Sequence, residues 1–479
     1  MSPPAGWEAV IGLEVHCELL TATKLFCGCR NEFGAAPNSH VCPVCLGLPG
    51  SLPVLNEQAV ELAMRIGLAL GCEVRPSVFH RKNYFYPDMP KDYQVTQYDE
   101  PINVDGHLDL PDGSTVGIVR AHIEEDTGKT THVGDSGRIH GAGHALVDYN
   151  RAGVPLVEIV SAPDITSAAQ ARAYAAELRA VLVASGASDG RMEEGSMRVD
   201  ANVSVRRVGD RELGTRCEVK NLNSLRSLAR AVDHEIERQV ALVSAGERVV
   251  QQTRHWDEDR GATVALRSKE EAYDYRYFPE PDLVPLVPGT AWVERVRGSL
   301  GPMPAQRRRA VAAVLGDATS NPGRADQVGT VVELGLDHLV LAAAAGGVDP
   351  ALALARTANE AAAGADAARA VDPDAYVALL RMEQAGDLSA TQAKTVLAEL
   401  LGGGGDPAAI AERLGFEGLS SASVADAVSA VVAEHPEEWA RFCAGEEKLA
   451  GFFTGHVMRA TQGKANGKVV AAELASRRG

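Results

Sequence analysis

The chain has 479 residues, too many for one hydrophobic core, so two to four domains are expected. Hydrophobic residues make up 45% and charged residues 23%, a balance that excludes global disorder. The net charge of -17 disfavours coating of nucleic acid or of an anionic membrane by bulk charge, although a local basic patch could still bind RNA.

The N-terminal segment has neither the basic region nor the apolar stretch of a signal peptide, and no run of about 18 apolar residues occurs. We therefore predict a cytoplasmic protein that makes no use of a membrane. Eight cysteines in such a chain are expected as thiols or metal ligands rather than as disulfides.

Up to about residue 292, short strand patterns alternate with helix patterns. Apolar and polar residues alternate over 9–16 and 198–205, which predicts strands. Apolar residues at helical spacing predict helices over 56–70, 167–185 and 224–242. This mixture favours an α+β fold with an antiparallel sheet.

Beyond the proline-rich stretch 279–288, the composition shifts to Ala, Leu, Arg and Glu. We predict only helices from about residue 293. The four glycines at 402–405 are too flexible for a helix interior and predict a linker between two helical units. The predicted domains are therefore 1–292, 293–405 and 406–479.

The last 32 residues reverse the acidic balance of the chain. One acidic residue, Glu473, stands there against six basic ones: Lys448, Arg459, Lys464, Lys468, Arg477 and Arg478. A local patch of this kind is suited to nucleic-acid phosphates.

Four of the eight cysteines form two close pairs, Cys27 with Cys29 and Cys42 with Cys45, separated by twelve residues. This spacing predicts a tetrahedral zinc site, although the first pair is CxC rather than CxxC. Four thiolates would close the coordination sphere, so we expect the zinc to be structural; free thiols or a redox pair are the alternatives. The isolated cysteines are expected as buried, small apolar side chains: Cys17, Cys72, Cys217 and Cys443.

Residues 122–129 carry the densest cluster of negative charge. Glu124, Glu125 and Asp126 follow His122 without a helical charge partner. Like charges this close raise one another's pKa unless a cation neutralises them, and magnesium with a nucleotide phosphate is a common solution. If the segment is a strand, Glu124 and Glu125 lie on opposite faces and could line two sides of one site. A solvated charged turn is the alternative.

Further acids occur in strand patterns, each flanked by apolar residues: Glu14, Glu158, Asp200 and Glu218. A carboxylate inside an apolar strand is costly unless it is paired or coordinates a metal. Glu14 and His16 stand two apart, so their side chains share one face and could share one cation; a half-exposed strand is the alternative. Several such strands in one domain predict a single acidic, metal-filled concavity.

Basic and aromatic residues gather at 81–88, ahead of Lys91, Gln94 and Gln97, and again at 269–280. Tyrosines beside cations suit a phosphate or a stacked base, whereas a loop that caps the core is the alternative. Residues 128–130 mimic the end of a phosphate loop, but Ile123 stands where its first glycine is required. The sequence has no nucleophile elbow and no Ser-Lys pair that would mark an amidase.

Together these motifs resemble the B subunits of bacterial aspartyl/glutamyl-tRNA amidotransferases. The matching residues are 12–16, 27–29, 42–50, 81–88, 122–129, 149–158, 192–196, 219–224 and 274–282. They span most of residues 10–285, and the joint match is highly specific. Toward the C-terminus the resemblance thins to 463–466, with Gly467 in place of the usual proline and Glu360 in place of a common tryptophan.

The resemblance implies a cradle-shaped α+β domain similar to glutamine synthetase, then an all-α helical domain and a small helical tail that contacts tRNA. It also implies a reaction: ATP phosphorylates the side-chain carboxylate of aspartate or glutamate on mischarged tRNA(Asn) or tRNA(Gln), and ammonia displaces the phosphate. The glutaminase (amidase), or A, subunit would supply the ammonia through a channel, and a small C subunit would complete a heterotrimer. The implied cofactors are ATP, Mg2+ and structural Zn2+.

By motif, the resemblance assigns magnesium to Glu14, His16, Glu124, Glu125, Glu158, Asp200 and Glu218. It assigns zinc to Cys27, Cys29, Cys42 and Cys45. The expected catalytic residues are Glu125, Glu124 and His16, with Lys82 and Lys91 as candidates for orienting phosphate or the reactive end of the ammonia path. The basic tail is expected at tRNA phosphates, so Lys464→Ala would lower the salt slope of tRNA binding by about one unit.

Two rivals are open. The archaeal-type enzyme, specific for glutamate on tRNA(Gln), carries an inserted domain after the cradle, for which residues 286–300 leave no room. A non-enzymatic, zinc-containing subunit that only presents tRNA would not explain acids and an imidazole on strands that face polyanionic RNA.

Overall fold

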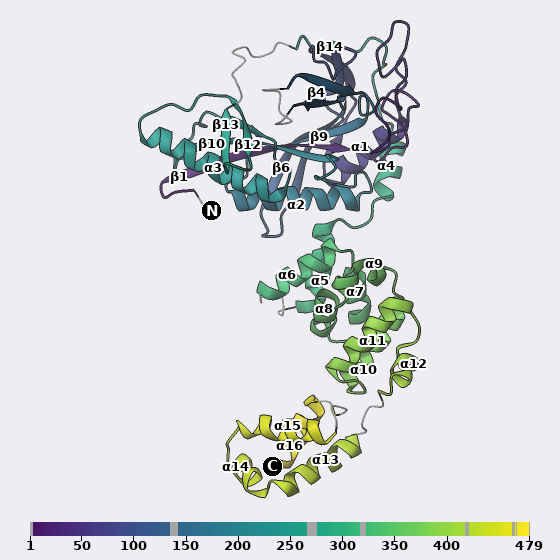
Figure 1. Cartoon of the computed structure of the whole chain (residues 1–479), viewed down its shortest axis with the longest axis vertical. Coiled ribbons are helices and arrows are strands. Elements are labelled where there is room, and N and C mark those ends of the chain that lie inside the picture. The colour runs from purple at the N-terminus through teal and green to yellow at the C-terminus, as the bar shows by residue number, and fades with distance from the viewer. Residues whose placement is uncertain are drawn as a thin grey trace. The chain divides into compact units, whose positions relative to one another are not determined.

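The computed structural model describes residues 3–134, 142–265, 275–316, 322–416, 421–461, 465 and 467–478. The chain forms two compact units, Met1–Ala305 and Gln306–Gly479 (Figure 1). Residues 269–274 of the second basic and aromatic segment, and Lys464 of the basic tail, lie outside the described residues.

A large sheet forms the centre of the first unit. Among the described residues it has twelve strands, in the order β13-β12-β11-β10-β1-β9-β6-β4-β3-β14, with β5 paired to β6 and β2 paired to β5. These strands are β1 (Trp7–Glu18), β2 (Glu73–Val74), β3 (Val78–Asn83), β4 (Tyr93–Glu100), β5 (Asn103–Asp109), β6 (Thr115–Glu125), β9 (Pro155–Ser161), β10 (Met197–Arg207), β11 (Cys217–Lys220), β12 (Thr253–Asp257), β13 (Ala262–Ala265) and β14 (Phe278–Pro279).

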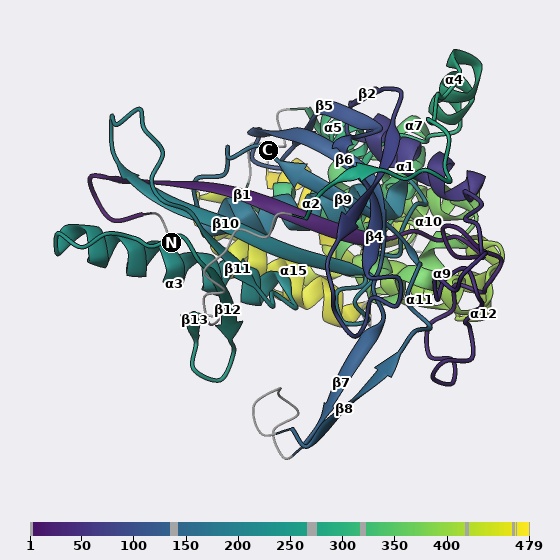
Figure 2. The same cartoon turned by 90° about the horizontal axis from the view of Figure 1, so that it is seen from above.

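The predicted antiparallel α+β fold is confirmed, with one exception in the pairing: β12 runs parallel to β11. The strands predicted over 9–16 and 198–205 lie within β1 and β10, which pair along their length. A separate two-stranded ribbon, β7 (Lys129–Val133) with β8 (His144–Asp148), projects away from the sheet (Figure 2).

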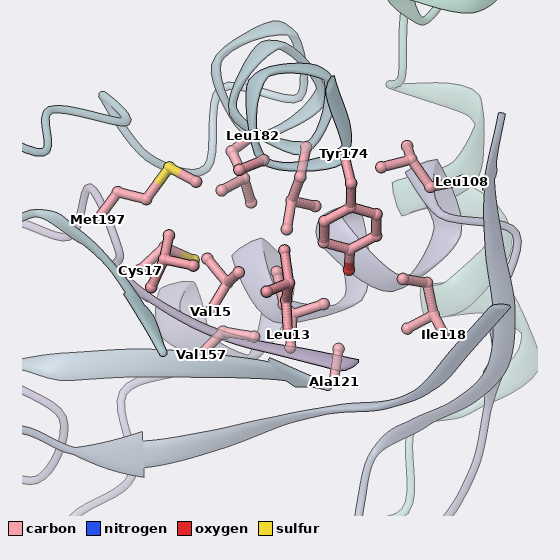
Figure 3. Close-up of a cluster of buried hydrophobic side chains, with 14 of the residues drawn as sticks. Leu13, Val15, Cys17, Leu108, Ile118, Ala121, Val157, Tyr174, Leu182 and Met197 are labelled. Atoms are coloured by element: carbon pink, nitrogen blue, oxygen red, sulfur yellow. The ribbon is translucent and has the colours of Figure 1, made fainter. Parts of the chain in front are cut away.

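The two faces of the sheet differ in polarity. Along β1 the burial alternates, so that odd-numbered residues such as Leu13 and Val15 are buried and even-numbered ones are half-buried. Figure 3 shows the buried face, where these side chains meet Tyr174 and Leu182 of helix α2. Because the apolar face is covered, the even-numbered polar residues of the central strands point to the opposite face.

Three helices cover the buried face, and all three confirm the sequence prediction: α1 (Glu57–Ala69), α2 (Ala168–Ala184) and α3 (Leu225–Ser244). Each begins after a residue whose side chain accepts hydrogen bonds from the first free amides, namely Asn56, Ser167 and Ser224. A fourth helix, α4 (Thr290–Gly298), spans the predicted boundary at 292, and its Val296 packs into the core of the first unit.

The described part of the second unit contains helices only, as predicted. They are α5 (Pro304–Leu315), which begins just before the unit boundary, α6 (Pro322–Glu333), α7 (Asp337–Ala345), α8 (Pro350–Asn359), the 3-10 helix η2 (Ala361–Gly364), α9 (Ala365–Arg369), α10 (Pro373–Ala385), α11 (Ala390–Gly403), α12 (Pro407–Arg413), α13 (Ser421–Glu434), α14 (Pro436–Cys443), α15 (Leu449–Ala460) and α16 (Gly467–Arg478). Their buried side chains form two separate apolar clusters, one between Val311 and Ala411 and one between Val424 and Leu474.

The glycine run at 402–405 differs from its prediction. Gly402 and Gly403 continue the last turn of α11, and Gly404 ends the helix with a φ of 69°. Glycine is common at this position because it adopts positive φ at little cost. The division of the second unit into two domains stays a prediction.

No single helix of the described residues is long and apolar enough to cross a membrane, and only the pair Gly323–Glu333 with Asp337–Ala345, bent by 110°, reaches that length and hydropathy together.

Candidate functional site

The register of the central strands brings three predicted ligands together. His16 on β1 lies opposite Glu158 on β9, and Glu124 follows on β6, the next strand. His16 Nε2 is 3.4 Å from Glu124 Oε1 and 3.9 Å from Glu158 Oε2. One ligand atom from each of these residues lies within 4.8 Å of the others, so the three could hold one metal ion.

The electrostatics of this cluster favour a bound cation. Burial, with the neighbouring Glu158, raises the pKa of Glu124 to about 8. Burial, with Glu14, raises the pKa of Glu158 to about 6. Burial, with Arg198, lowers the pKa of His16 to about 3, so the imidazole is neutral and a lone pair is free for a metal. Two carboxylates that resist ionisation and a neutral imidazole fit a divalent metal, which would compensate the buried charge.

The other predicted ligands lie farther along the same face and already have partners. Asn202 donates a hydrogen bond to Glu14 Oε1 at 2.9 Å. Lys220 Nζ lies 2.8 Å from Asp200 Oδ2 and 2.9 Å from Glu218 Oε1. Lys220 thus neutralises two of the acids that the motif assigned to magnesium, and sequence reasoning did not give this lysine a role.

Glu125 lies apart from the His16 cluster, because alternation along β6 turns its side chain to the other face. Its oxygens accept hydrogen bonds from Lys91 Nζ at 2.6 and 2.5 Å and from the Val95 amide at 3.1 Å. The Glu125 side chain is buried and the Lys91 side chain is only 10% exposed. The structure therefore joins two predicted catalytic residues, Glu125 and Lys91, to each other rather than to the metal ligands.

Asp126 is a site residue that the sequence interpretation assigned to a turn. It is 3% exposed, and its Oδ2 lies 2.7 Å from Arg198 Nη2 and 3.2 Å from Arg151 Nε. The sequence did contain a signal for Arg198: it stands two residues before Asp200 on one strand, so the two side chains share a face.

A cavity of about 530 Å³ opens beside the cluster. Its lining combines acids, cations and amides: His16, Lys82, Gln94, Glu124, Asp126, Arg198, Asp200, Lys220, Asn221 and Asn223 among others. Acids that suit a metal thus face cations that suit phosphate oxygens across one pocket. Lys82, a predicted phosphate-orienting residue, also lies 4.9 Å from the ring centroid of Tyr275.

The two basic and aromatic segments meet at the edge of the sheet. Phe278 on β14 pairs with Arg81 on β3. Arg81 forms a bidentate pair with the buried Glu280, with nitrogen–oxygen distances of 2.7 and 2.8 Å, and lies over the ring of Tyr93. Arg81 therefore links β3 to the segment that follows β14.

The four paired cysteines converge, so that Cys27, Cys29, Cys42 and Cys45 could hold one metal ion such as zinc. A hydrogen bond from Cys27, with the Cys42 backbone and the Lys24 ammonium, lowers the pKa of Cys45 to about 5. The resulting thiolate is the form that binds metal. Among the isolated cysteines, Cys443 is exposed, which corrects its predicted burial; it lies at the end of a short helix.

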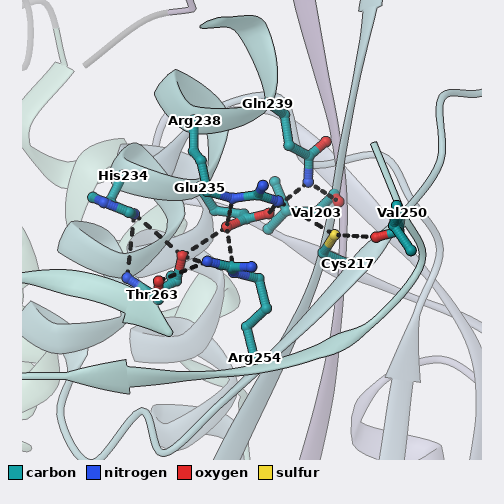
Figure 4. Close-up of polar contacts among 9 residues, drawn as sticks. All are labelled: Val203, Cys217, His234, Glu235, Arg238, Gln239, Val250, Arg254 and Thr263. Atoms are coloured by element: carbon teal, nitrogen blue, oxygen red, sulfur yellow. Dashed lines mark hydrogen bonds and ion pairs between the residues drawn. The ribbon is translucent and has the colours of Figure 1, made fainter. Parts of the chain in front are cut away.

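A buried polar network anchors the far end of the sheet (Figure 4). Glu235 on α3 is fully buried and accepts hydrogen bonds from Arg238, Gln239 and Thr263, with Arg254 at 3.4 Å. Gln239 also donates to the carbonyl of Val203 on β10. The network therefore fixes β12 and β13 against α3, next to the strand that carries Glu218 and Lys220.

Comparison with known proteins assigns the chain to a family. Residues 9–294 match the GatB/GatE catalytic domain, and residues 346–477 match the GatB domain. The aspartyl/glutamyl-tRNA(Asn/Gln) amidotransferase B subunit of Anaeromyxobacter sp. (strain K) is 49% identical over 98% of this chain and 99% of its own length. The B subunits of Nocardia farcinica and Moorella thermoacetica are each 48% identical over 96% of this chain, covering 94% and 97% of their own lengths. This chain therefore belongs to the family of aspartyl/glutamyl-tRNA(Asn/Gln) amidotransferase B subunits.

Proposed function

We propose that this chain is the transamidating subunit that converts Asp-tRNA(Asn), Glu-tRNA(Gln) or both to the corresponding amides at the expense of ATP. The observation that carries the proposal is the convergence of His16, Glu124 and Glu158 beside a cavity that is lined by the first two of these residues and by Arg198, Lys82 and Lys220. Family membership supports the tRNA-linked amidotransferase reaction.

The chemistry explains why the pocket needs both signs of charge. A carboxylate is a poor acyl donor, because oxide is a poor leaving group. Transfer of the γ-phosphoryl group of ATP to the side-chain carboxylate gives an acyl phosphate, and attack by ammonia on its carbonyl carbon then releases phosphate and forms the amide. Both steps bring anions together, so cations must lie close to the transferring group.

Roles follow from position in the pocket. His16, Glu124 and Glu158 would hold Mg2+, which offsets negative charge as the phosphoryl group passes between two anions. Arg198, held by Asp126 at 2.7 Å, and Lys82 are suited to phosphate oxygens. Lys220 would keep the charges of Asp200 and Glu218 neutralised. If its ammonium group moved away, the two carboxylates could bind a second cation.

The remaining parts are proposed as support. We assign structural Zn2+ to Cys27, Cys29, Cys42 and Cys45. A glutaminase partner, the A subunit, would supply ammonia and would act together with a small C subunit. The basic C-terminal helices would contact tRNA. A non-enzymatic protein that only presents tRNA is the second candidate; two carboxylates held beside an imidazole at the same site argue against it.

The decisive experiment measures ATP hydrolysis and amide formation with mischarged tRNA and the partner subunits present. Glu124→Gln should abolish both, while glutamine hydrolysis by the partner persists. Glu247→Gln, which changes an exposed acid in the loop after α3, is the matched control and should behave as the unsubstituted chain. Normal amidation by Glu124→Gln, or no tRNA-dependent ATP turnover in the unsubstituted complex, would favour the tRNA-presenting role.

A further inference from the structure

Lys24 is a fully buried lysine that has no part in the reaction proposed above. Its Nζ donates a hydrogen bond to the carbonyl oxygen of Tyr149 at 3.2 Å, and among the residues that the structure describes no carboxylate lies within 4 Å of it. A carbonyl oxygen carries only a partial charge, whereas an ammonium group taken out of water needs a full counter-charge. The surroundings of Lys24 must therefore supply negative charge in another form.

The backbone places Lys24 at the base of the turn that carries the first cysteine pair. The Lys24 amide donates to the carbonyl of Cys29 at 3.0 Å, and the amide that follows it donates to the carbonyl of Gly153 at 2.9 Å. Asn56 Nδ2 donates to the Lys24 carbonyl at 3.2 Å. The side chain thus begins beside the cysteines and reaches the segment 149–153, which leads into β9.

The second cysteine pair approaches the same side chain. Gly153 has a φ of 83°, and a Cβ atom built on it would lie 3.6 Å from Cys45 Cβ and 3.7 Å from Lys24 Cδ. Together with a hydrogen bond from Cys27, the attraction of the Lys24 ammonium lowers the pKa of the Cys45 thiol. Lys24 and Cys45 therefore border the same point of the backbone, and the ammonium acts on the sulfur.

One acid also borders this point, but it is already paired. Glu125 Oε1 would lie 3.7 Å from the same Cβ position at Gly153. Its carboxylate oxygens accept hydrogen bonds from Lys91 Nζ and from the Val95 amide. The four cysteine sulfurs, which converge next to Lys24, can supply the charge instead. Four thiolates around one Zn2+ leave a net negative charge of about two, because the ion cancels only half of their charge.

We propose that Lys24 is the counter-charge of the four-cysteine site, so that its buried ammonium compensates the negative charge of the zinc-loaded thiolates and raises their affinity for zinc. Lys24 is not itself a ligand; it acts through the cysteines, as charged groups around a metal's ligands commonly do. This inference rests on the structural Zn2+ of the proposed function, and it adds the residue that balances the charge of that site.

The first test measures zinc affinity by competition with a chelator, using the full-length chain. Lys24→Met keeps a similar side-chain shape but removes the charge, and it should weaken zinc binding by about tenfold. Lys394→Met, which changes a lysine of α11 with a side chain 53% exposed, is the matched control and should bind zinc as the unsubstituted chain does. Equal affinities in Lys24→Met and in the control would overturn the inference.

A second variant separates charge from packing. Lys24→Arg keeps the charge and alters the shape, whereas Lys24→Met does the opposite. If the charge is what matters, Lys24→Arg binds zinc more tightly than Lys24→Met. The reverse order would assign the effect to packing and contradict the inference.

A spectroscopic test reports on the sulfurs directly. Co2+ replaces zinc in the cysteine site, and the sulfur-to-cobalt charge-transfer band is recorded in the near ultraviolet. A cation beside the thiolates stabilises the sulfur electrons, so its removal in Lys24→Met should move the band to lower energy, while Lys394→Met leaves it unchanged. A band at the same energy in both variants would show that the ammonium does not act on the sulfurs.

The inference and the proposed function fail in different ways. An unsubstituted chain that takes up neither zinc nor Co2+ would remove the zinc assignment and the inference with it. Zinc binding that is as tight in Lys24→Met as in the unsubstituted chain would remove the inference alone. A zinc-loaded complex without tRNA-dependent ATP turnover, in which Lys24→Met still weakens zinc binding, would remove the transamidation function and support the inference.

Discussion

Lys91 and Glu125 form a buried ion pair behind the metal-ligand cluster, with Nζ 2.5 Å from Oε2 and side chains 10% and 3% exposed. The pair joins the loop before β4 to the end of β6. Neither residue belongs to the set of His16, Glu124 and Glu158. The adjacent residues Glu124 and Glu125 therefore contact different partners.

This pair gives a first prediction. Glu125→Ala should abolish ATP-dependent amidation while glutamine hydrolysis by the partner persists. It should also lower the free energy of unfolding by about 3–5 kcal/mol, because Lys91 is left as an uncompensated buried charge. Activity assays and chemical denaturation measure the two effects. The double variant Lys91→Met with Glu125→Gln should regain most of the stability but not the amidation; amidation at the normal rate in Glu125→Ala would remove Glu125 from the reaction.

A second prediction concerns pH. In the metal-free protein the pKa of Glu124 is raised to about 8 and that of Glu158 to about 6. A metal binds the ionised carboxylates, so protons compete with it, and affinity should rise with pH by about tenfold per unit between pH 6 and 8. Calorimetry in buffers of different ionisation enthalpy should detect one proton released near pH 7. An affinity that stays flat across this range would argue against Glu124 as a ligand.

Metal removal at the cysteine site gives a third prediction. Cys45→Ser should lower the zinc content of the purified chain and reduce its melting temperature, because a tetrathiolate site contributes its binding energy to folding. Cys443→Ser is the control, since that thiol is exposed and remote in sequence from the four ligands. Equal zinc content in the two variants, measured by elemental analysis, would show that the four cysteines do not hold the metal.

The network around Glu235 gives a fourth prediction. Glu235→Gln should destabilise the first unit by about 3–5 kcal/mol, because Arg238 and Arg254 lose a buried counter-charge. Glu237→Gln, two residues away on the exposed face of the same helix, should change stability by less than about 0.5 kcal/mol. Thermal melts of both variants provide the comparison, and similar melting temperatures would show that the network adds little to the stability of the first unit.

A fifth prediction tests the basic tail. Lys464→Ala should weaken tRNA binding and lower its salt slope by about one unit, as one phosphate contact is lost. Binding measured at several salt concentrations provides the slope. The same slope in both proteins would count against a phosphate contact at this residue.

The sequence predicted those features that depend on local periodicity. Alternation within β6 was sufficient to place Glu124 and Glu125 on opposite faces, and the helical spacing of apolar residues was sufficient to predict α2 and α3. Partners that meet across the sheet were not predictable in this way. Asp126 and Arg198 stand 72 residues apart, and Lys91 and Glu125 stand 34 apart, so only the register of several strands brings them together.

Glycine and cysteine are the least reliable signals in this chain. The four-glycine run predicts a break, but helix ends tolerate glycine, and α11 extends through its first two members. Cysteine is usually buried, whereas the short helix that carries Cys443 leaves this thiol exposed. In both cases the position of the residue at a helix end decides the outcome, and composition alone does not reveal that position.

The set of His16, Glu124 and Glu158 has a consequence for assembly of the fold. Its three members come from strands far apart in the chain, and a shift of one residue in either pairing would turn a ligand toward the helices. A cation at this site would therefore bind only the correctly paired sheet. At a cation concentration of about a hundred times the dissociation constant, binding would raise the free energy of unfolding by about 2.7 kcal/mol. Metal ions in the refolding buffer would then stabilise the native strand register relative to shifted registers.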